Sequence, residues 1–190
     1  MTTASFVQLD QAELLRLALH AIGSNDSGTA LSYLKEAVSR PDATANAHFM
    51  LGAEYAQIGM IDRAIPAIET ALALDPALSI ARFQLGLLRL TCGDPATAID
   101  VLHPLDSLGD EHPLFHFGKG LVALARNELS EALHGLTCGI ERNHDNPALN
   151  TDMLKIAHNI SRAISDQATS SESADTQHIF LSAYKGSMND

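Results

Sequence analysis

Apolar and polar residues follow one another along this chain with the spacing of amphipathic helices. The clearest case is residues 45–58, whose apolar face comprises Phe49, Leu51, Gly52, Tyr55 and Ile58. A second face of this kind spans residues 61–72. Apolar residues at these intervals lie on one side of an α-helix. Between the two segments, Gly59 supplies the backbone freedom that the end of a helix favours. The pattern predicts two helices joined by a short turn.

The predicted helix pair recurs every 34 residues. This offset aligns three glycines, Gly52, Gly86 and Gly120. It also aligns small or turn-forming residues in two further columns: Ala30, Ala64, Ala98 and Ala132, and Asn25, Gly59, Gly93 and Asn127. Phe49, Phe83 and Phe117 form another column. A fixed period of this length indicates a tandem array of one helical hairpin. The small residues predict that paired helices approach closely.

The repeated residues resemble the tetratricopeptide repeat. In residues 45–78 the match consists of Leu51-Gly52, Tyr55, Ala64, Ile68 and Asp75-Pro76, which fit W-x2-L-G-x2-Y…A-x3-F…P. The tryptophan of that pattern is replaced by Leu14, His48, Arg82 and His116. The resemblance implies an all-α fold, a right-handed α-solenoid of four helix-turn-helix repeats followed by a C-terminal capping helix.

The period divides the chain into successive segments. We expect a lead at 1–10, repeats at 11–44, 45–78, 79–112 and 113–146, a capping helix at 147–165, and a Ser-rich linker with an apolar tail at 166–190. Asp10 with Glu13 predicts a helix N-cap, and Asp94-Pro95 predicts a helix start with proline in its first position. Pro104 is predicted to kink or end the second helix of its repeat.

Composition and charge narrow the class of protein. Hydrophobic residues make up 46% of the 190 residues, which favours a folded chain. The 12 Lys+Arg against 23 Asp+Glu give a net charge of −11, which argues against nucleic acid and anionic membranes. No apolar run is long enough to insert into a membrane. Two cysteines and the absence of signal-peptide features at the start favour a cytoplasmic location.

Residues with catalytic or metal-binding chemistry form no recognisable motif. His112 with His116, and His134 with Cys138, are four residues apart and can share a helix face, but neither pair has an evident third ligand. We expect no metal site, no cofactor and no catalytic residues. Cys92 and Cys138 are expected to be buried small residues.

The resemblance to tetratricopeptide repeats implies a concave groove lined by the first helix of each repeat. The corresponding residues in this sequence are Leu15, Leu19, Asn46, Phe49, Ala53, Ala56, Ile80, Phe83, Leu87, Leu90, Leu114, Phe117, Leu121 and Leu124. They predict an apolar groove with a column of phenylalanines. The lysines and asparagines with which some members of the family bind a C-terminal carboxylate are missing here. The alternative is that these side chains pack between neighbouring helices.

The C-terminal tail carries an apolar island after a Ser-rich stretch. Its apolar residues are Ile179, Phe180, Leu181 and Tyr184. The tail is a candidate for docking into the groove of its own chain or of a second copy, which would give self-association. The alternatives are a free tail or one that packs on the capping helix.

These features favour a non-enzymatic protein-interaction module, an adaptor or scaffold whose groove binds an apolar or amphipathic segment of a partner protein. The alternative is a chaperone that shields hydrophobic segments of client proteins, similar to the tetratricopeptide-repeat chaperones of bacterial secretion systems. An enzyme has no support from particular residues.

Overall fold

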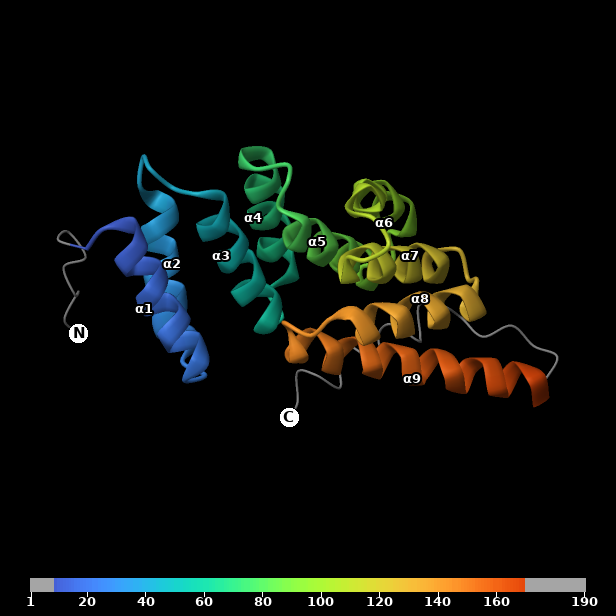
Figure 1. Cartoon of the computed structure of the whole chain (residues 1–190). Coiled ribbons are helices and arrows are strands. Elements are labelled where there is room, and N and C mark those ends of the chain that lie inside the picture. Colours follow the sequence, from blue (N-terminus) through green and yellow to red (C-terminus); the bar gives the residue numbers. More distant parts are fainter. Residues whose placement is uncertain (1–8, 170–190) are drawn as a thin grey trace. The chain divides into compact units, whose positions relative to one another are not determined.

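A computed structural model describes residues 9–169, and every regular element in that range is a helix (Figure 1). The first elements are α1 (Gln11–Gly23), α2 (Ser27–Ser39), α3 (Ala45–Gln57), α4 (Ile61–Leu74) and α5 (Ser79–Thr91). The remaining elements are α6 (Pro95–Leu102), the 3-10 helix η2 (His103–Leu108), α7 (Pro113–Ala125), α8 (Leu129–Arg142) and α9 (Pro147–Thr169). The all-α class expected from the sequence is confirmed.

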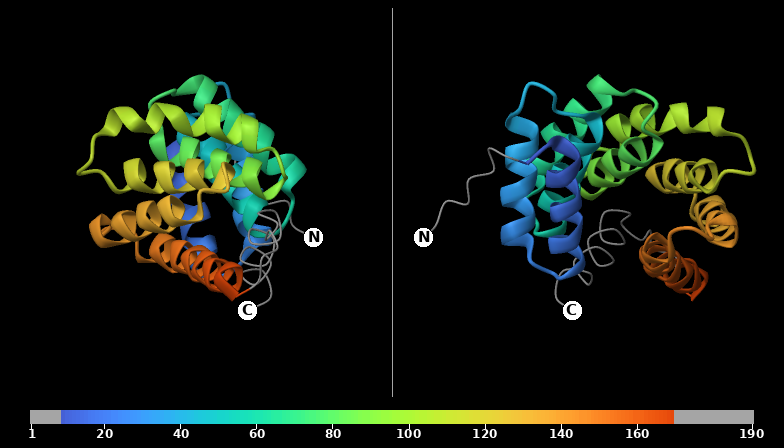
Figure 2. Two further views of the ribbon diagram at one scale, coloured as in Figure 1. Left: turned by 90° about the vertical axis from the view of Figure 1, so that its right-hand side faces the viewer. Right: turned by 60° about the vertical axis from the view of Figure 1, so that its left-hand side comes forward.

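The chain divides into two compact units, an N-terminal unit that ends at Ala81 and a C-terminal unit that begins at Arg82. In the N-terminal unit α1 packs on α2 and α3 on α4, while α2 also packs on α3. In the C-terminal unit α6 contacts α7, α7 packs on α8, and α8 packs on α9 (Figure 2). Successive helices therefore form the hairpins that the sequence predicts.

Glycines allow the two helices of a hairpin to touch along their backbones. A Cβ atom added at Gly52 of α3 would lie 2.5 Å from Ile68 Cγ1 and 3.0 Å from the Ala64 carbonyl oxygen of α4. A Cβ atom at Gly120 of α7 would lie 2.9 Å from the Leu136 amide nitrogen of α8. Both separations are too short for a side chain, which confirms the predicted close approach.

The turn inside each hairpin adopts the same backbone conformation. Its positive φ falls at Asn25 (55°), Gly59 (78°), Gly93 (75°) and Asn127 (61°). Glycine and asparagine tolerate this left-handed conformation better than other residues. The aligned column of Asn and Gly therefore marks the C-terminal turn of each first helix.

Helix starts follow the predicted capping residues. The Asp10 side chain accepts a hydrogen bond from the Glu13 amide and the Glu13 side chain accepts one from the Asp10 amide, both at 2.8 Å, which makes a capping box. Asp94 caps α6 by accepting from the Thr97 amide at 3.2 Å, with Pro95 at the first helical position.

The second helix of the third repeat, α6, is short, as Pro104 predicts. α6 ends at Leu102, and the chain continues as the 3-10 helix η2. Proline cannot donate the backbone hydrogen bond that would continue an α-helix. The final helix, α9, begins at Pro147 and runs to Thr169, beyond the expected end at residue 165. Its buried residues include Met153, Ile156 and Ile160.

Each unit has its own apolar core. In the N-terminal unit Leu14 of α1, Ala37 of α2 and Ala47 of α3 are fully buried together. In the C-terminal unit the rings of Phe83 and Phe117 lie 5.9 Å apart. Among the described residues, none of the helices combines the length and the apolar character that crossing a lipid bilayer demands.

Candidate functional site

The predicted groove residues of the N-terminal unit keep part of their surface open. Leu19 of α1 is 57% exposed. Asn46 of α3 is also exposed. Leu15, Phe49, Ala53 and Ile80 are half-buried. On α1 the buried face comprises Leu14, Ala18 and Ala21. Leu15 and Leu19 lie one position further around the helix. Leu15 packs at the edge of the core, and Leu19 lies outside it. This surface of α1 and α3 is called the α1–α3 face below.

The corresponding residues of the C-terminal unit are buried, except for Leu87. Leu114, Phe117 and Leu121 of α7 are 7%, 0% and 0% exposed, and Phe83 of α5 is 2% exposed. Leu90 and Leu124 are also buried, as is Ala56 of α3, while Leu87 is half-buried. The expectation of an open apolar wall is therefore wrong for this unit.

The Phe117 ring occupies the space over Gly139 of α8, where a Cβ atom would collide with it.

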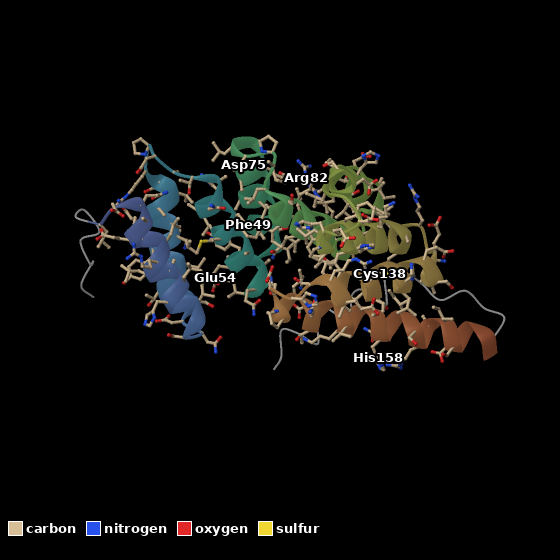
Figure 3. The ribbon with its side chains drawn as sticks, viewed as in Figure 1. Phe49, Glu54, Asp75, Arg82, Cys138 and His158 are labelled. Carbon is tan, nitrogen blue, oxygen red and sulfur yellow. The ribbon has the colours of Figure 1, made fainter. Side chains whose placement is uncertain are left out.

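Glu54 is a charged residue in the interior of the N-terminal unit. It is 5% exposed and lies two turns after Ala47 on α3 (Figure 3). Residues seven apart share one side of a helix, and Ala47 packs against Leu14 and Ala37. Glu54 therefore lies on the side of α3 that faces the first hairpin.

No hydrogen bond or ion pair to the Glu54 carboxylate occurs within residues 9–169. Two cations nearby in the fold are directed elsewhere: Lys35 Nζ lies 6.0 Å and Arg63 Cζ 5.9 Å from the centre of the Tyr55 ring. Partial burial lowers the pKa of His48, which disfavours a positive charge on its imidazole. α3 itself contains no lysine or arginine, and the carboxylate lacks a counter-charge from its own helix.

Sequence reasoning missed Glu54, although a signal was present. At offsets of 34 residues its column contains Leu88 and Val122 in the third and fourth repeats. Leu88 is buried and Val122 half-buried. In the first repeat the column holds the exposed His20. A buried carboxylate at a position that holds an apolar side chain in the later repeats needs a separate explanation.

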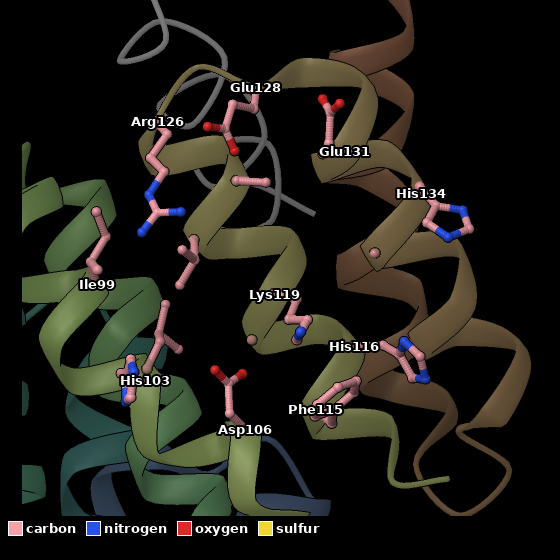
Figure 4. A pocket seen from close by; sticks show the side chains of 15 residues that line it. Ile99, His103, Asp106, Phe115, His116, Lys119, Arg126, Glu128, Glu131 and His134 are labelled. Atoms are coloured by element: carbon pink, nitrogen blue, oxygen red, sulfur yellow. The ribbon is translucent and has the colours of Figure 1, made fainter. Parts of the chain in front are cut away.

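The C-terminal unit has a hollow of about 620 Å³ over α7, lined also by α6, η2 and α8 (Figure 4). Ile99 and Leu102 of α6 and Val122 of α7 contribute its apolar lining. Its charged lining residues are Asp106, Lys119, Arg126, Glu128 and Glu131. Lys119 Nζ lies 4.7 Å from the centre of the Phe115 ring. The hollow combines charges of both signs, and the sequence did not indicate it because it depends on the change from α6 to η2.

The histidine pairs make separate contacts. His112 caps α7 through Nδ1, which accepts from the Leu114 amide at 3.1 Å. His116 Nε2 donates to the Asp110 carbonyl oxygen at 2.6 Å. His134 and Cys138 lie side by side, with Cys138 Sγ 3.7 Å from His134 Nε2. The described part of the chain contains no group of three or more residues that could hold a metal ion.

The expectation of two buried cysteines is wrong. Cys92 is exposed and Cys138 is partly exposed, and both are free thiols. Cys92 follows the last residue of α5, where the chain turns at Gly93 and leaves the side chain outside the core. The tail residues Ile179, Phe180, Leu181 and Tyr184 lie outside the described residues.

Comparisons with known proteins agree with this architecture. The tetratricopeptide repeat family model matches residues 45–78. No curated protein matches the sequence. A crystal structure of MamA is 22% identical with a TM-score of 0.59, covering 73% of this chain and 81% of that one. MamA 41-end from Desulfovibrio magneticus RS-1 is 16% identical, with a TM-score of 0.62 and 94% of each chain covered.

A further structural neighbour is YrrB, described as a TPR protein with an unusual peptide-binding site. It is 17% identical with a TM-score of 0.60, covering 99% of this chain and 92% of that chain. At these identities the likeness shows a shared fold. The family match at 45–78 falls on α3 and α4, the hairpin that carries Phe49, Ala53 and Glu54.

Proposed function

Since this chain is a tetratricopeptide-repeat protein, we propose that it is a non-enzymatic protein-interaction module. It acts as an adaptor or scaffold and binds an apolar or amphipathic segment of a partner protein on the α1–α3 face. The segment lies against the first helices of the first two hairpins and contacts Leu15, Leu19, Phe49 and Ala53. Helix-in-groove recognition uses apolar surface of this kind.

The observation that carries this proposal is the exposure of Leu19. A leucine that is 57% exposed, next to the half-buried Leu15 and on the same unit as Phe49, leaves apolar surface in contact with water. Fully burying a Leu or Phe side chain is worth about 1.5–3 kcal/mol. Covering this surface with a partner therefore gives favourable binding energy.

The proposal includes a cytoplasmic location. Cys92 is an exposed free thiol, and unpaired exposed thiols persist in a reducing compartment. The net charge of −11 supports protein rather than nucleic-acid partners, because phosphate binding requires clustered Lys and Arg.

The α1–α3 face also suits the alternative function, a chaperone for hydrophobic segments of client proteins. The two functions differ in what happens to the partner. A client of a chaperone is insoluble when it is expressed alone and becomes soluble with this chain. The partner of an adaptor remains soluble in both cases, so expression of the pair distinguishes the two functions.

Two matched leucine substitutions test the proposed surface. Leu19 on α1 and Leu74 at the end of α4 are 57% and 54% exposed, so glutamate is tolerated equally at both. Affinity capture from cell extract with quantitative mass spectrometry is expected to lose one defined prey with Leu19→Glu and to keep it with Leu74→Glu. Circular dichroism confirms that both variants are folded. An identical prey set for wild type and both variants contradicts the proposal.

A further inference from the structure

We propose that Glu54 selects the charge of the bound segment: its carboxylate forms an ion pair with a lysine or arginine of the partner. This inference rests on the proposed function of the α1–α3 face and adds to it the chemistry of the ligand. The occupant is an amphipathic segment that places apolar side chains on the α1–α3 face and one basic side chain at Glu54.

An isolated carboxylate is costly to bury. Glu54 is 5% exposed, and no hydrogen bond or ion pair to its carboxylate occurs in the described part of the chain. Proteins that bury a charge normally pair it, because the loss of hydration costs several kcal/mol for each ion. No such pair forms at Glu54 within residues 9–169, where its oxygens have only solvent as a partner, and a basic side chain of a bound segment would supply the missing counter-charge.

The position of Glu54 on α3 fits a segment bound on the α1–α3 face. Ala47, on the same side of α3 as Glu54, packs against Leu14, and the half-buried Leu15 packs against this same cluster. Glu54 thus lies on the side of α3 that faces the first hairpin, whose α1 also carries the exposed Leu19. A segment bound across α1 and α3 would bring a long basic side chain within reach of this carboxylate.

The Glu54 carboxylate is accessible to a partner. The carboxylate oxygens of Glu54 are not among the fully enclosed, unpaired side-chain atoms of the described residues. Because the side chain has no partner, its oxygens must retain contact with solvent. A buried stem with an accessible carboxylate is open to a long basic side chain, whose methylenes lie along apolar surface while its charged end reaches the acid.

The charges of the chain also favour a basic partner at Glu54. Lys35 and Arg63 lie over the Tyr55 ring, and the ion pairs within the described residues join other partners, among them Arg40 with Glu36 and Lys155 with Asp152. The chain carries 23 acidic against 12 basic residues, so the protein as a whole attracts a basic segment.

A peptide binding experiment with the full chain tests the inference. The probes are fluorescein-labelled amphipathic peptides of about 16 residues with leucines at helical spacing. One lysine is moved in turn through the positions that flank the leucine face, and each peptide has a counterpart with glutamine in place of that lysine. Fluorescence anisotropy gives Kd for wild type, Glu54→Gln and Leu74→Glu.

In the best register, the lysine peptide is expected to bind wild type about tenfold more tightly than its glutamine counterpart. Glu54→Gln should remove this preference and leave the affinity for the glutamine peptide unchanged. Leu74→Glu should behave as wild type. The preference is then a property of the pair formed by Glu54 and the lysine.

A lysine preference that persists in Glu54→Gln overturns the inference, and so does equal binding of lysine and glutamine peptides in every register. In both cases the proposed function stands, provided that Leu19→Glu weakens binding. If no peptide binds wild type, the inference is wrong, and the capture experiment with Leu19→Glu decides separately on the proposed function.

The stability of the free protein gives an independent readout. Replacing an unpaired, buried carboxylate by the neutral Gln in Glu54→Gln should raise Tm by about 2–4 °C. A lower Tm would mean that the carboxylate is already satisfied inside the fold, and the inference would then be wrong.

Discussion

At the scale of single residues, Gly52 sets the distance between α3 and α4. A Cβ atom there would lie 2.5 Å from Ile68 Cγ1 and 3.0 Å from the Ala64 carbonyl oxygen. Because the second contact is with backbone, a side-chain rotation cannot relieve it. Gly52→Ala is expected to lower the free energy of unfolding by about 1–3 kcal/mol, the usual cost of overpacking. Urea denaturation followed by circular dichroism measures this loss.

Gly23 is the matched control for that substitution. It is the last residue of α1 in the same unit, and a Cβ atom there would have no atom within 4 Å. Gly23→Ala is therefore expected to raise the free energy of unfolding by about 0.4–1 kcal/mol, since alanine restricts the unfolded chain. If both variants lost the same free energy of unfolding, the close approach of α3 and α4 at Gly52 would not be the cause of the loss.

The burial of Glu54 and the exposure of Leu19 could not be predicted from the residue pattern. The 34-residue columns identify which positions share a role, yet burial depends on how far each neighbouring helix covers them. Phe49 is half-buried whereas Phe83 and Phe117 of the same column are buried. The sequence predicted candidate residues for the groove, but whether each is exposed or packed depends on the three-dimensional arrangement of the neighbouring helices.

At the scale of helices, the N-cap of α6 makes stability depend on pH. The hydrogen bonds that Asp94 accepts from the side chain and amide of Thr97 hold the pKa of its carboxyl below the usual value of 3.8. A carboxyl whose pKa is lower in the folded state stabilises the folded protein at pH values above its pKa in the unfolded state. This contribution is lost as the pH falls through the lower, folded-state pKa.

Comparison with Asp94→Asn isolates this contribution, because asparagine also caps helices but does not titrate. Thermal unfolding is followed from neutral pH to about pH 3, below the usual pKa of aspartate. The Tm of wild type relative to Asp94→Asn is expected to be constant near neutral pH and to fall in the acidic range. A constant difference over the whole range would contradict a titrating cap.

Local signals predicted most of the helices. Features that depend on packing between elements could not be predicted in this way. Turn residues of positive φ, the Asp10 capping box and Pro104 each determine a helix end within a few residues of themselves. Pro66 lies inside α4 without ending it. There the buried Ala64, Ile68 and Ala71 hold the helix against α3, because tertiary packing outweighs a local preference. The hollow over α7 likewise depends on contacts between elements.

At the scale of the whole molecule, the dominant property is the net charge of −11. Ion pairs on the surface add little to stability, but a negative potential over the whole chain acts on partners before contact. An acidic chain attracts basic segments and repels acidic ones, so charge affects mainly the association rate. This long-range effect differs from the contact at Glu54, which acts once the segment is bound.

The two effects are separable by their dependence on salt. Between about 50 mM and about 500 mM NaCl, the Debye length falls from roughly 14 Å to roughly 4 Å. The association rate constant of the lysine peptide is expected to fall about tenfold over this range. Its dissociation rate constant should change far less, because an ion pair in a buried setting is poorly screened. Stopped-flow anisotropy measures both, with the glutamine counterpart as the control of lower charge. If salt acted mainly on dissociation, the lysine would be paired in open solvent, away from the buried position of Glu54.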